Sequence, residues 1–234
     1  MSTNSDLFDL SNWKLTLPVD AESGNTGKAA EVKKLSGYED PVYFYDATDG
    51  AMVFRANAEG ATTSGSTYAR CELRERDNGT DAYWNLNEGG TLTATLKVDE
   101  VPTLNDGSAG RIIVGQIHGL SDELVRLYYD DGQLYFANEH SGADNKEHKF
   151  IPVNGQGEAA QIALGEKFSY EITARGDTLL VKVIHGGQEY ISKTVINEIW
   201  QSDSFYFKAG LYMGVNENNG SGDGQVSFYG LDFG

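Results

Sequence analysis

A long series of short runs, either alternating in polarity or rich in β-branched and aromatic residues, constrains this chain more than any other feature. Period-two runs of this length are typical of β-strands, and their regular spacing favours an antiparallel sandwich or barrel. Asp-Gly, Asn-Gly and Gly-Gly pairs recur along the chain and suit tight turns. The predicted strands are residues 13–17, 51–56, 67–76, 91–99, 111–118, 124–130, 133–138, 168–174, 178–184, 188–194, 204–213 and 225–233.

Helix signals are poor. The best segment, 193–201, suits a short helix or a strand followed by a loop, and the polar segment 139–161 suits a long loop. No internal repeat or linker is visible, so residues 1–234 are expected to form a single domain. The predicted fold class is all-β, an antiparallel two-sheet β-sandwich with a concave face that could hold an extended ligand.

The net charge of −17 argues against nucleic acid as a partner, because phosphate binding depends on clustered Lys and Arg. A local basic groove remains compatible with this total. The single cysteine, Cys71, excludes an internal disulfide, and its alternation with charged neighbours predicts a place in the core. No run is long enough for a membrane span, and residues 1–10 carry no signal-peptide pattern.

Three segments carry polar groups suited to binding a carboxylate and moving protons: Arg70-Cys71-Glu72-Leu73-Arg74, Gln116-Ile117-His118, and residues 206–212. Side chains two apart on a strand share a face. One face should therefore carry Arg70, Glu72, Arg74, Gln116, His118, Tyr206, Lys208 and Tyr212. The alternate residues should point into the core.

Each segment also has a simpler interpretation. The charges at 70–74 could form a surface ladder, and His118 could be a structural histidine. Lys208 and Tyr212 could be ordinary solvent-facing residues of an amphipathic strand. Against this, two arginines flank Glu72, which predicts that Glu72 holds both guanidinium groups and leaves a positive charge for a carboxylate ligand. No His, Asp or Glu spacing suggests a metal-ligand set, and no phosphate loop is present.

The ordered motifs RCELR, QIH and YFKAGLY resemble those of polysaccharide lyase family 7, the alginate lyases. The family pattern is R(S/T)E(L/V)R, Q(I/V)H and YxKAGxYxQ, and the segment FDLSNWKLTLP at 8–18 also resembles the family's start. The resemblance covers residues 8–234. Two positions depart from the pattern: Cys71 replaces Ser or Thr, and Gly214 stands where Gln or Asn is common.

This resemblance implies a jelly-roll fold and β-elimination on alginate, an acidic polysaccharide, without metal or cofactor. It implies a monomeric bacterial enzyme that is secreted or periplasmic and favours guluronate-containing blocks. The implied catalytic residues are Arg70, Gln116, His118 and Tyr212, and the implied substrate-binding residues are Arg74, Lys208 and Glu72. Arg70 and Gln116 would neutralise the uronate carboxylate, while His118 and Tyr212 would serve as base and acid.

Two other functions are compatible with a β-sandwich. A non-catalytic carbohydrate-binding module would need aromatic platforms and no proton-transfer pair, so His118 and Tyr212 disfavour it. A glycoside hydrolase would need two acids facing each other across the bond. Glu72 and Glu75 are three apart and should lie on opposite faces of their strand, which argues against that activity.

Overall fold

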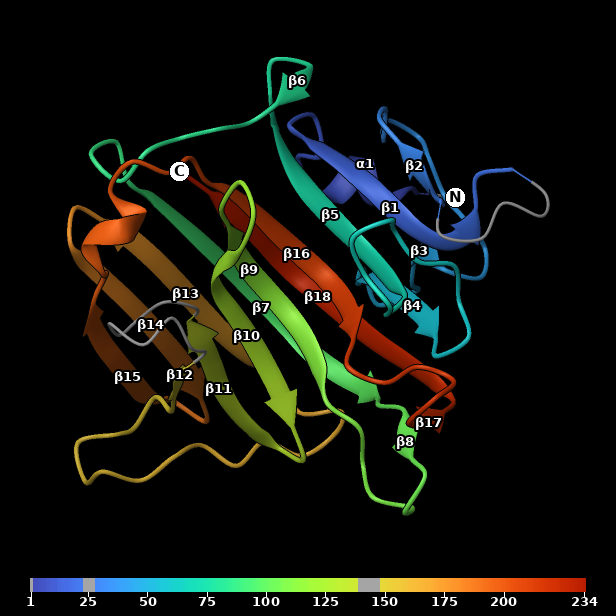
Figure 1. Cartoon of the computed structure of the whole chain (residues 1–234). Helices are drawn as coiled ribbons and strands as arrows, with labels where there is room; N and C mark the ends of the chain where they lie inside the picture. The colour runs from blue at the N-terminus through green and yellow to red at the C-terminus, as the bar shows by residue number, and fades with distance from the viewer. Residues whose placement is uncertain (1, 23–27, 139–147) are drawn as a thin grey trace.

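Two large antiparallel sheets pack face to face in the computed structural model, which describes residues 2–22, 28–138 and 148–234 (Figure 1). The nine-stranded sheet contains, in spatial order, β12 (His148–Phe150), β11 (Gln133–Asn138), β10 (Glu123–Asp130), β9 (Ile112–His118), β16 (Tyr206–Met213), β5 (Arg70–Asp77), β1 (Trp13–Asp20) and β2 (Ala29–Val32), with β6 (Thr80–Asp81) paired to β5. This sheet carries the three motifs.

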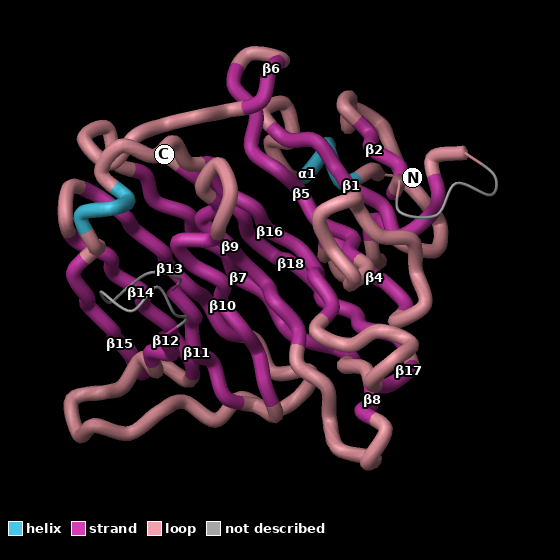
Figure 2. Tube along the Cα trace, viewed as in Figure 1, coloured by secondary structure: helices cyan, strands magenta, loops and turns pink. Residues whose placement is uncertain are grey.

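The seven-stranded sheet lies behind it in Figure 1. Its strands are, in order, β15 (Gln188–Val195), β14 (Thr178–His185), β13 (Phe168–Arg175), β7 (Gly90–Glu100), β18 (Asp223–Phe233), β4 (Met52–Asn57) and β3 (Phe44–Asp46). A small third sheet pairs β8 (Thr103–Leu104) with β17 (Gly220–Ser221). Most of the described chain is strand or loop, and helix is confined to α1 (Asn4–Leu7) and a 3₁₀ turn at Glu198–Trp200 (Figure 2).

The predicted all-β two-sheet sandwich is confirmed, and each predicted run is a strand whose ends lie within a few residues of those expected. The prediction missed the short strands β2, β3, β6, β8, β12 and β17, because two to four residues are too few to show a periodic pattern. Segment 193–201 proves to be the end of β15 followed by the 3₁₀ turn.

Within the predicted loop 139–161, residues 139–147 lie outside the described part of the chain. The remainder opens with β12 and continues as turns and isolated bridges. None of the helices in the described ranges has the length and apolar character of a membrane span.

The core lies between the two sheets and is built from the inward residues of each alternating strand. Strand β7, for example, buries every second side chain, including Leu92, Leu96 and Val98. One hydrogen bond joins the sheets directly beneath the motif strands: Tyr170 of β13 donates its hydroxyl to the Val114 carbonyl at 2.9 Å. A Cβ at the next residue, Gly115, would lie 2.6 Å from that hydroxyl, so glycine permits this close approach.

Candidate active site

The three motifs lie on neighbouring strands in the middle of the nine-stranded sheet. Strand β16 is paired with β5 on one side and with β9 on the other. Lys208 therefore stands between Arg74 and Gln116, while Tyr212 pairs with Arg70. The sheet thus brings the motifs together on one surface, here called the motif face.

The inward alternation predicted for β5 and β16 is confirmed. Cys71 and Leu73 are buried in the core, as are the alternate residues of β16, which are Phe207, Ala209, Leu211 and Met213. The Cys71 thiol contacts the Tyr43 carbonyl, and burial raises its pKa, so it behaves as a packed apolar residue. The predicted position of Cys71 is correct.

Glu72 is the centre of the motif face, with its side chain 1% exposed. It accepts hydrogen bonds from Arg70 Nη1 at 2.9 Å, from Gln116 Nε2 at 2.5 Å and from Lys208 Nζ at 2.7 Å. Burial alone would raise the pKa of Glu72, but Lys208 and Arg70 outweigh it, and the pKa lies below its usual range. Two cations share one carboxylate, so this cluster carries a surplus positive charge.

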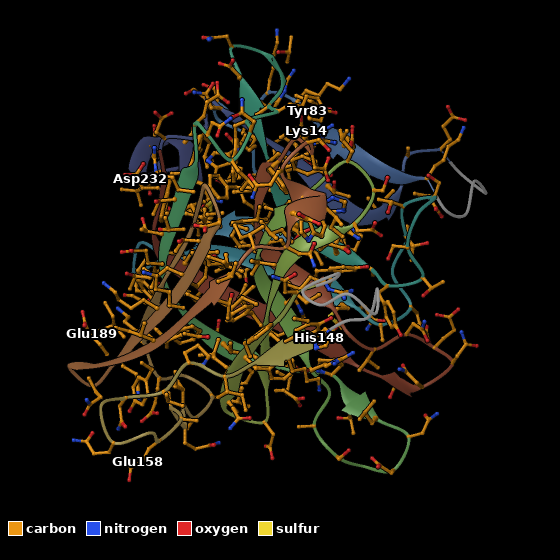
Figure 3. The ribbon with its side chains drawn as sticks, turned by 60° about the vertical axis from the view of Figure 1, so that its left-hand side comes forward. Lys14, Tyr83, His148, Glu158, Glu189 and Asp232 are labelled. Atoms are coloured by element: carbon orange, nitrogen blue, oxygen red, sulfur yellow. The ribbon has the colours of Figure 1, made fainter. Side chains whose placement is uncertain are left out.

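The prediction that Glu72 holds both neighbouring arginines is wrong for Arg74. The Arg74 guanidinium forms an ion pair with Asp81 at 3.4 Å and donates to the Tyr83 hydroxyl at 3.0 Å. Asp81 comes from β6, a two-residue strand, and it also binds Lys14 at 3.2 Å. Lys14 and Tyr83 accordingly lie together in Figure 3, well away from His148.

Gln116 is fully buried, and its side-chain amide donates to Glu72 rather than projecting outward. Its carbonyl oxygen Oε1 is buried with no hydrogen-bond partner among the described residues. This geometry makes Gln116 a support for Glu72. Direct contact between Gln116 and a bound carboxylate stays a prediction.

His118 is held by three contacts. Its Nδ1 lies 2.6 Å from the Gly119 carbonyl, which assigns the proton to Nδ1 and leaves the lone pair on Nε2. The ring stacks on Tyr206 with centroids 5.0 Å apart, and Nε2 lies 3.6 Å from Glu123 Oε1. Burial lowers the pKa of His118, and the positive charge of Lys208 lowers it further, so the neutral imidazole is favoured.

Tyr212 lies at the other end of the cluster. The Arg70 guanidinium stacks on its ring, 3.7 Å from the centroid. The Tyr212 hydroxyl is hydrogen-bonded to Ser66 Oγ at 2.7 Å, and Ser66 in turn donates to the Tyr68 carbonyl. Ring and hydroxyl are thus both fixed, as a proton-transfer group requires.

A cavity of about 600 Å³ adjoins this end of the site, with Ser66 in its wall. Its lining also includes the acidic residues Asp20, Glu59 and Glu217. The larger concave groove expected over the motif face stays a prediction.

A register shift alters the motif face near Tyr212. Between Gly115 and Ile113, strand β9 has one residue more than β10, so the side chains of β9 stop alternating there. Ile113 therefore packs on the motif face against Tyr212, while Ile112 and Val114 face the core. Strict alternation from His118 would have placed Ile113 in the core instead.

Glu75 lies on the core side of β5, opposite Glu72. It accepts the Phe207 amide at 2.8 Å and the Trp84 indole N–H at 3.1 Å, and burial raises its pKa. The two carboxylates face opposite ways, as predicted, and cannot form the acid pair of a glycoside hydrolase.

Sequence reasoning assigned no role to Glu123, Ser66 or Asp81, each of which contacts a predicted site residue. Glu123 pairs with His118 across the hairpin that joins β9 and β10. A hairpin turn predicted at 119–122 would have placed these two residues opposite each other. Ser66 and Asp81 reach the site from a loop and a two-residue strand and offered no such pattern. Among the described residues, no group of three or more His, Cys, Asp or Glu could hold a metal ion.

Comparison with known proteins identifies the family and the fold. The alginate lyase family model matches residues 8–234. A curated alginate lyase of Klebsiella pneumoniae is 37% identical over 278 aligned positions, covering 97% of this chain and 89% of the relative. A crystal structure of alginate lyase from Klebsiella pneumoniae has a TM-score of 0.86 at 33% identity, covering 100% of this chain and 98% of the other.

Alginate lyase AlgAT5 of polysaccharide lyase family 7 has a TM-score of 0.79 at 29% identity, covering 100% of this chain and 99% of its own. A variant of the family 7 alginate lyase A1-II′ in complex with the product GGG also has a TM-score of 0.79, at 27% identity and the same coverage. This chain belongs to the alginate lyases of polysaccharide lyase family 7.

Proposed function

We propose that this alginate lyase works on the motif face, with Arg70 and the Glu72 cluster binding the uronate carboxylate while His118 and Tyr212 transfer protons. The observation that carries the proposal is the sharing of Glu72 by Arg70 and Lys208, beside two fixed proton-transfer groups. β-Elimination removes the proton alpha to the carboxylate and breaks the C–O bond to the leaving sugar. The product carries a carbon–carbon double bond.

The alpha proton is poorly acidic, so the carboxylate must absorb the charge that develops when the proton leaves. Arg70 supplies a charged, planar donor for this purpose. Its position is fixed by Glu72 on one side and by the Tyr212 ring on the other. A donor fixed in advance stabilises developing charge without further rearrangement. Lys208 adds positive charge, and Gln116 positions Glu72.

His118 is suited to act as the base through Nε2, since its other nitrogen is occupied by the Gly119 carbonyl. Glu123, close to Nε2, would stabilise the imidazolium formed after proton removal. Tyr212 is suited to protonate the leaving oxygen, with Ser66 fixing its hydroxyl. Mannuronate and guluronate are epimers at the carbon that loses the proton. We therefore assign both proton transfers to Tyr212 for mannuronate and divide them between His118 and Tyr212 for guluronate.

A preference for guluronate-containing blocks is the finer part of this proposal. Structures of alginate lyase A1-II′ variants are described with the product GGG and with the substrate GGMG, and this chain shares their fold. Ile117, between Gln116 and His118, is fully buried, so its effect on block choice would act through the position of its neighbours.

The chain is further proposed to act as a monomeric domain spanning residues 1–234, in a secreted or periplasmic location. The reason for the location is that a long polyanion does not cross a membrane, so the enzyme has to meet it outside the cytoplasm. Size-exclusion chromatography with light scattering tests the monomer.

The first prediction concerns the activity itself. Purified protein treated with a chelator should still generate the ultraviolet absorbance of unsaturated uronate from alginate, and polyguluronate or mixed blocks should react faster than polymannuronate. Loss of activity on chelation with recovery on adding a divalent cation would contradict the role given to Arg70. Faster cleavage of polymannuronate would contradict the block preference. A carbohydrate-binding module, the alternative function, would produce no absorbance.

The second prediction separates the proton-transfer groups. His118→Asn removes the base but keeps a polar side chain, so cleavage of polyguluronate should fall by roughly 10² to 10⁴-fold and cleavage of polymannuronate much less. Initial rates on the two purified blocks measure this. Equal losses on both would show that His118 binds substrate rather than acting as the guluronate base.

The third prediction is a decline in activity above about pH 8. Burial, together with the charge of Arg70, lowers the pKa of Lys208 from 10.5 to about 8, so its positive charge is lost as pH rises through that value. Between about pH 8 and pH 10.5, Lys208 is protonated in the unfolded chain but largely neutral in the folded protein. The contribution of Lys208 to the free energy of unfolding therefore increases with pH over this range. Activity should therefore fall while thermal stability does not.

Lys208→Arg tests the cause, because arginine stays protonated throughout this range. The alkaline decline in kcat/KM should move to higher pH in the variant. An unchanged decline would assign it to another group.

A further inference from the structure

Gly214, directly after β16, is a glycine whose backbone conformation does not require glycine. Its φ does not lie in the left-handed region, so the reason for glycine is space. A Cβ at this position would lie 2.6 Å from the Arg111 carbonyl oxygen and 2.8 Å from Arg111 Cγ. The Gly214 amide donates to the same carbonyl at 3.0 Å. The backbone and the side-chain stem of Arg111 thus occupy the volume that any other residue at 214 would fill.

This close approach places the Arg111 guanidinium on the motif face. Its Cζ lies 4.5 Å from the centroid of the Tyr128 ring, and Nη1 donates to the Tyr135 hydroxyl at 2.8 Å. The rings of Tyr128 and Tyr135 stack on each other, 5.0 Å apart at 20°. These tyrosines belong to a cluster separate from the core, against which Tyr212 packs. The guanidinium is therefore supported by an aromatic surface next to the site.

The register gives the position of Arg111 relative to the reacting sugar. Ile113 pairs with Tyr212, and Tyr212 pairs with Arg70 on its other side. Arg111 precedes Ile113 by two residues, which is about 7 Å along a strand and returns the side chain to the same face. The strand that Arg111 directly precedes also lies two strand spacings, about 10 Å, from β5, which carries Arg70. The backbones at the two arginines are therefore about 12 Å apart across the sheet, which is more than one sugar unit.

We propose that Arg111 binds the carboxylate of a uronate unit farther along the chain than the one held by Arg70, on the Tyr212 side. Every unit of a uronate polymer carries a carboxylate, so a second cation farther along the motif face can bind another unit of the same chain. Arg111 is suited to this contact because a planar guanidinium binds carboxylate through paired hydrogen bonds. Its stack on Tyr128 fixes the plane of the guanidinium beforehand, which reduces the entropy lost on binding. The inference rests on the proposed function, since it takes alginate as the ligand.

The experiment measures binding of oligoguluronates of increasing length by calorimetry, in a Tyr212→Phe background that keeps the ring but lacks the proposed acid. Adding Arg111→Met should weaken binding roughly tenfold or more for oligomers long enough to reach position 111, and leave the shortest oligomers unaffected. Arg111→Lys should restore part of the loss, because lysine keeps the charge without the planar fork. Gly214→Ala, which displaces Arg111 with its charge intact, should reproduce the length-dependent loss.

Arg175→Met is the matched control. Arg175 is exposed at the end of β13 in the opposite sheet, so this change removes the same charge away from the motif face. If Arg111→Met and Arg175→Met weaken binding equally, or if the loss is the same at every oligomer length, the inference is overturned. Failure of the proposed function would appear separately, as inactivity of the unmodified protein on alginate. Melting temperatures of each variant identify any loss that comes from unfolding.

Discussion

Replacing Tyr212 with phenylalanine is expected to abolish cleavage of both polyguluronate and polymannuronate. The variant loses one hydroxyl, which is the proposed acid for every substrate, and keeps the ring on which Arg70 stacks. General acid catalysis contributes typically 10² to 10⁴-fold, and removal of the acid should cost at least that much. Initial rates of double-bond formation on the two purified blocks, with the melting temperature of each protein, measure the effect.

Two controls distinguish chemistry from structure. Tyr229→Phe removes a hydroxyl bound to Asp49, at a tyrosine of β18 in the opposite sheet, and should leave the rate nearly unchanged. Ser66→Ala removes the hydrogen bond that fixes the Tyr212 hydroxyl and should reduce the rate less than Tyr212→Phe does. A Tyr212→Phe protein that still cleaves either block at a normal rate would remove Tyr212 from catalysis.

Arg70→Ala is expected to reduce kcat/KM by roughly 10² to 10³-fold or more. Removing one donor that stabilises a developing oxyanion typically costs that factor, and Arg70 carries a full charge in addition. The melting temperature should fall only modestly, because Lys208 still neutralises the buried negative charge of Glu72 after Arg70 is removed. A variant that left a buried carboxylate with no cation would be destabilised more.

Arg70→Lys is the informative comparison. Lysine keeps the charge but loses both the paired hydrogen bonds and the flat stack on Tyr212, so activity should recover only in part. Arg55→Lys, at a surface ion pair with Asp223 in the opposite sheet, is the matched control and should be nearly neutral. A near-normal rate for Arg70→Lys would mean that charge alone suffices at this position.

The main features of the fold were readable because a strand's side-chain period is two, and that period is visible within a single run of residues. Alternation correctly placed Cys71 and Leu73 in the core and Glu72 on the opposite face. The same rule separates Glu72 from Glu75, so residue order alone excludes a hydrolase pair on this strand. The long strands were predicted for this reason, while strands of two to four residues had too few positions to show a period.

Alternation gave the wrong side-chain direction where the register between neighbouring strands shifts. Ile113 lies on the motif face because β9 carries one more residue than β10 over the same stretch. A register shift of this kind is a property of a strand pair, so neither strand reveals it separately. The same limit applies to Glu123, which meets His118 through pairing across a hairpin.

The sequence by itself determined the fold class, the family and the set of polar residues on one face of three strands, since each depends on residue order and on a period of two. Only the tertiary structure decided which of these residues are partners. In the structure, Lys208 forms an ion pair with Glu72, Arg74 forms an ion pair with Asp81, and Arg111 packs against Gly214. The physical reason is that a salt bridge or close packing depends on distances between strands far apart in the chain. Register and sheet order fix those distances, and no single segment of sequence contains them.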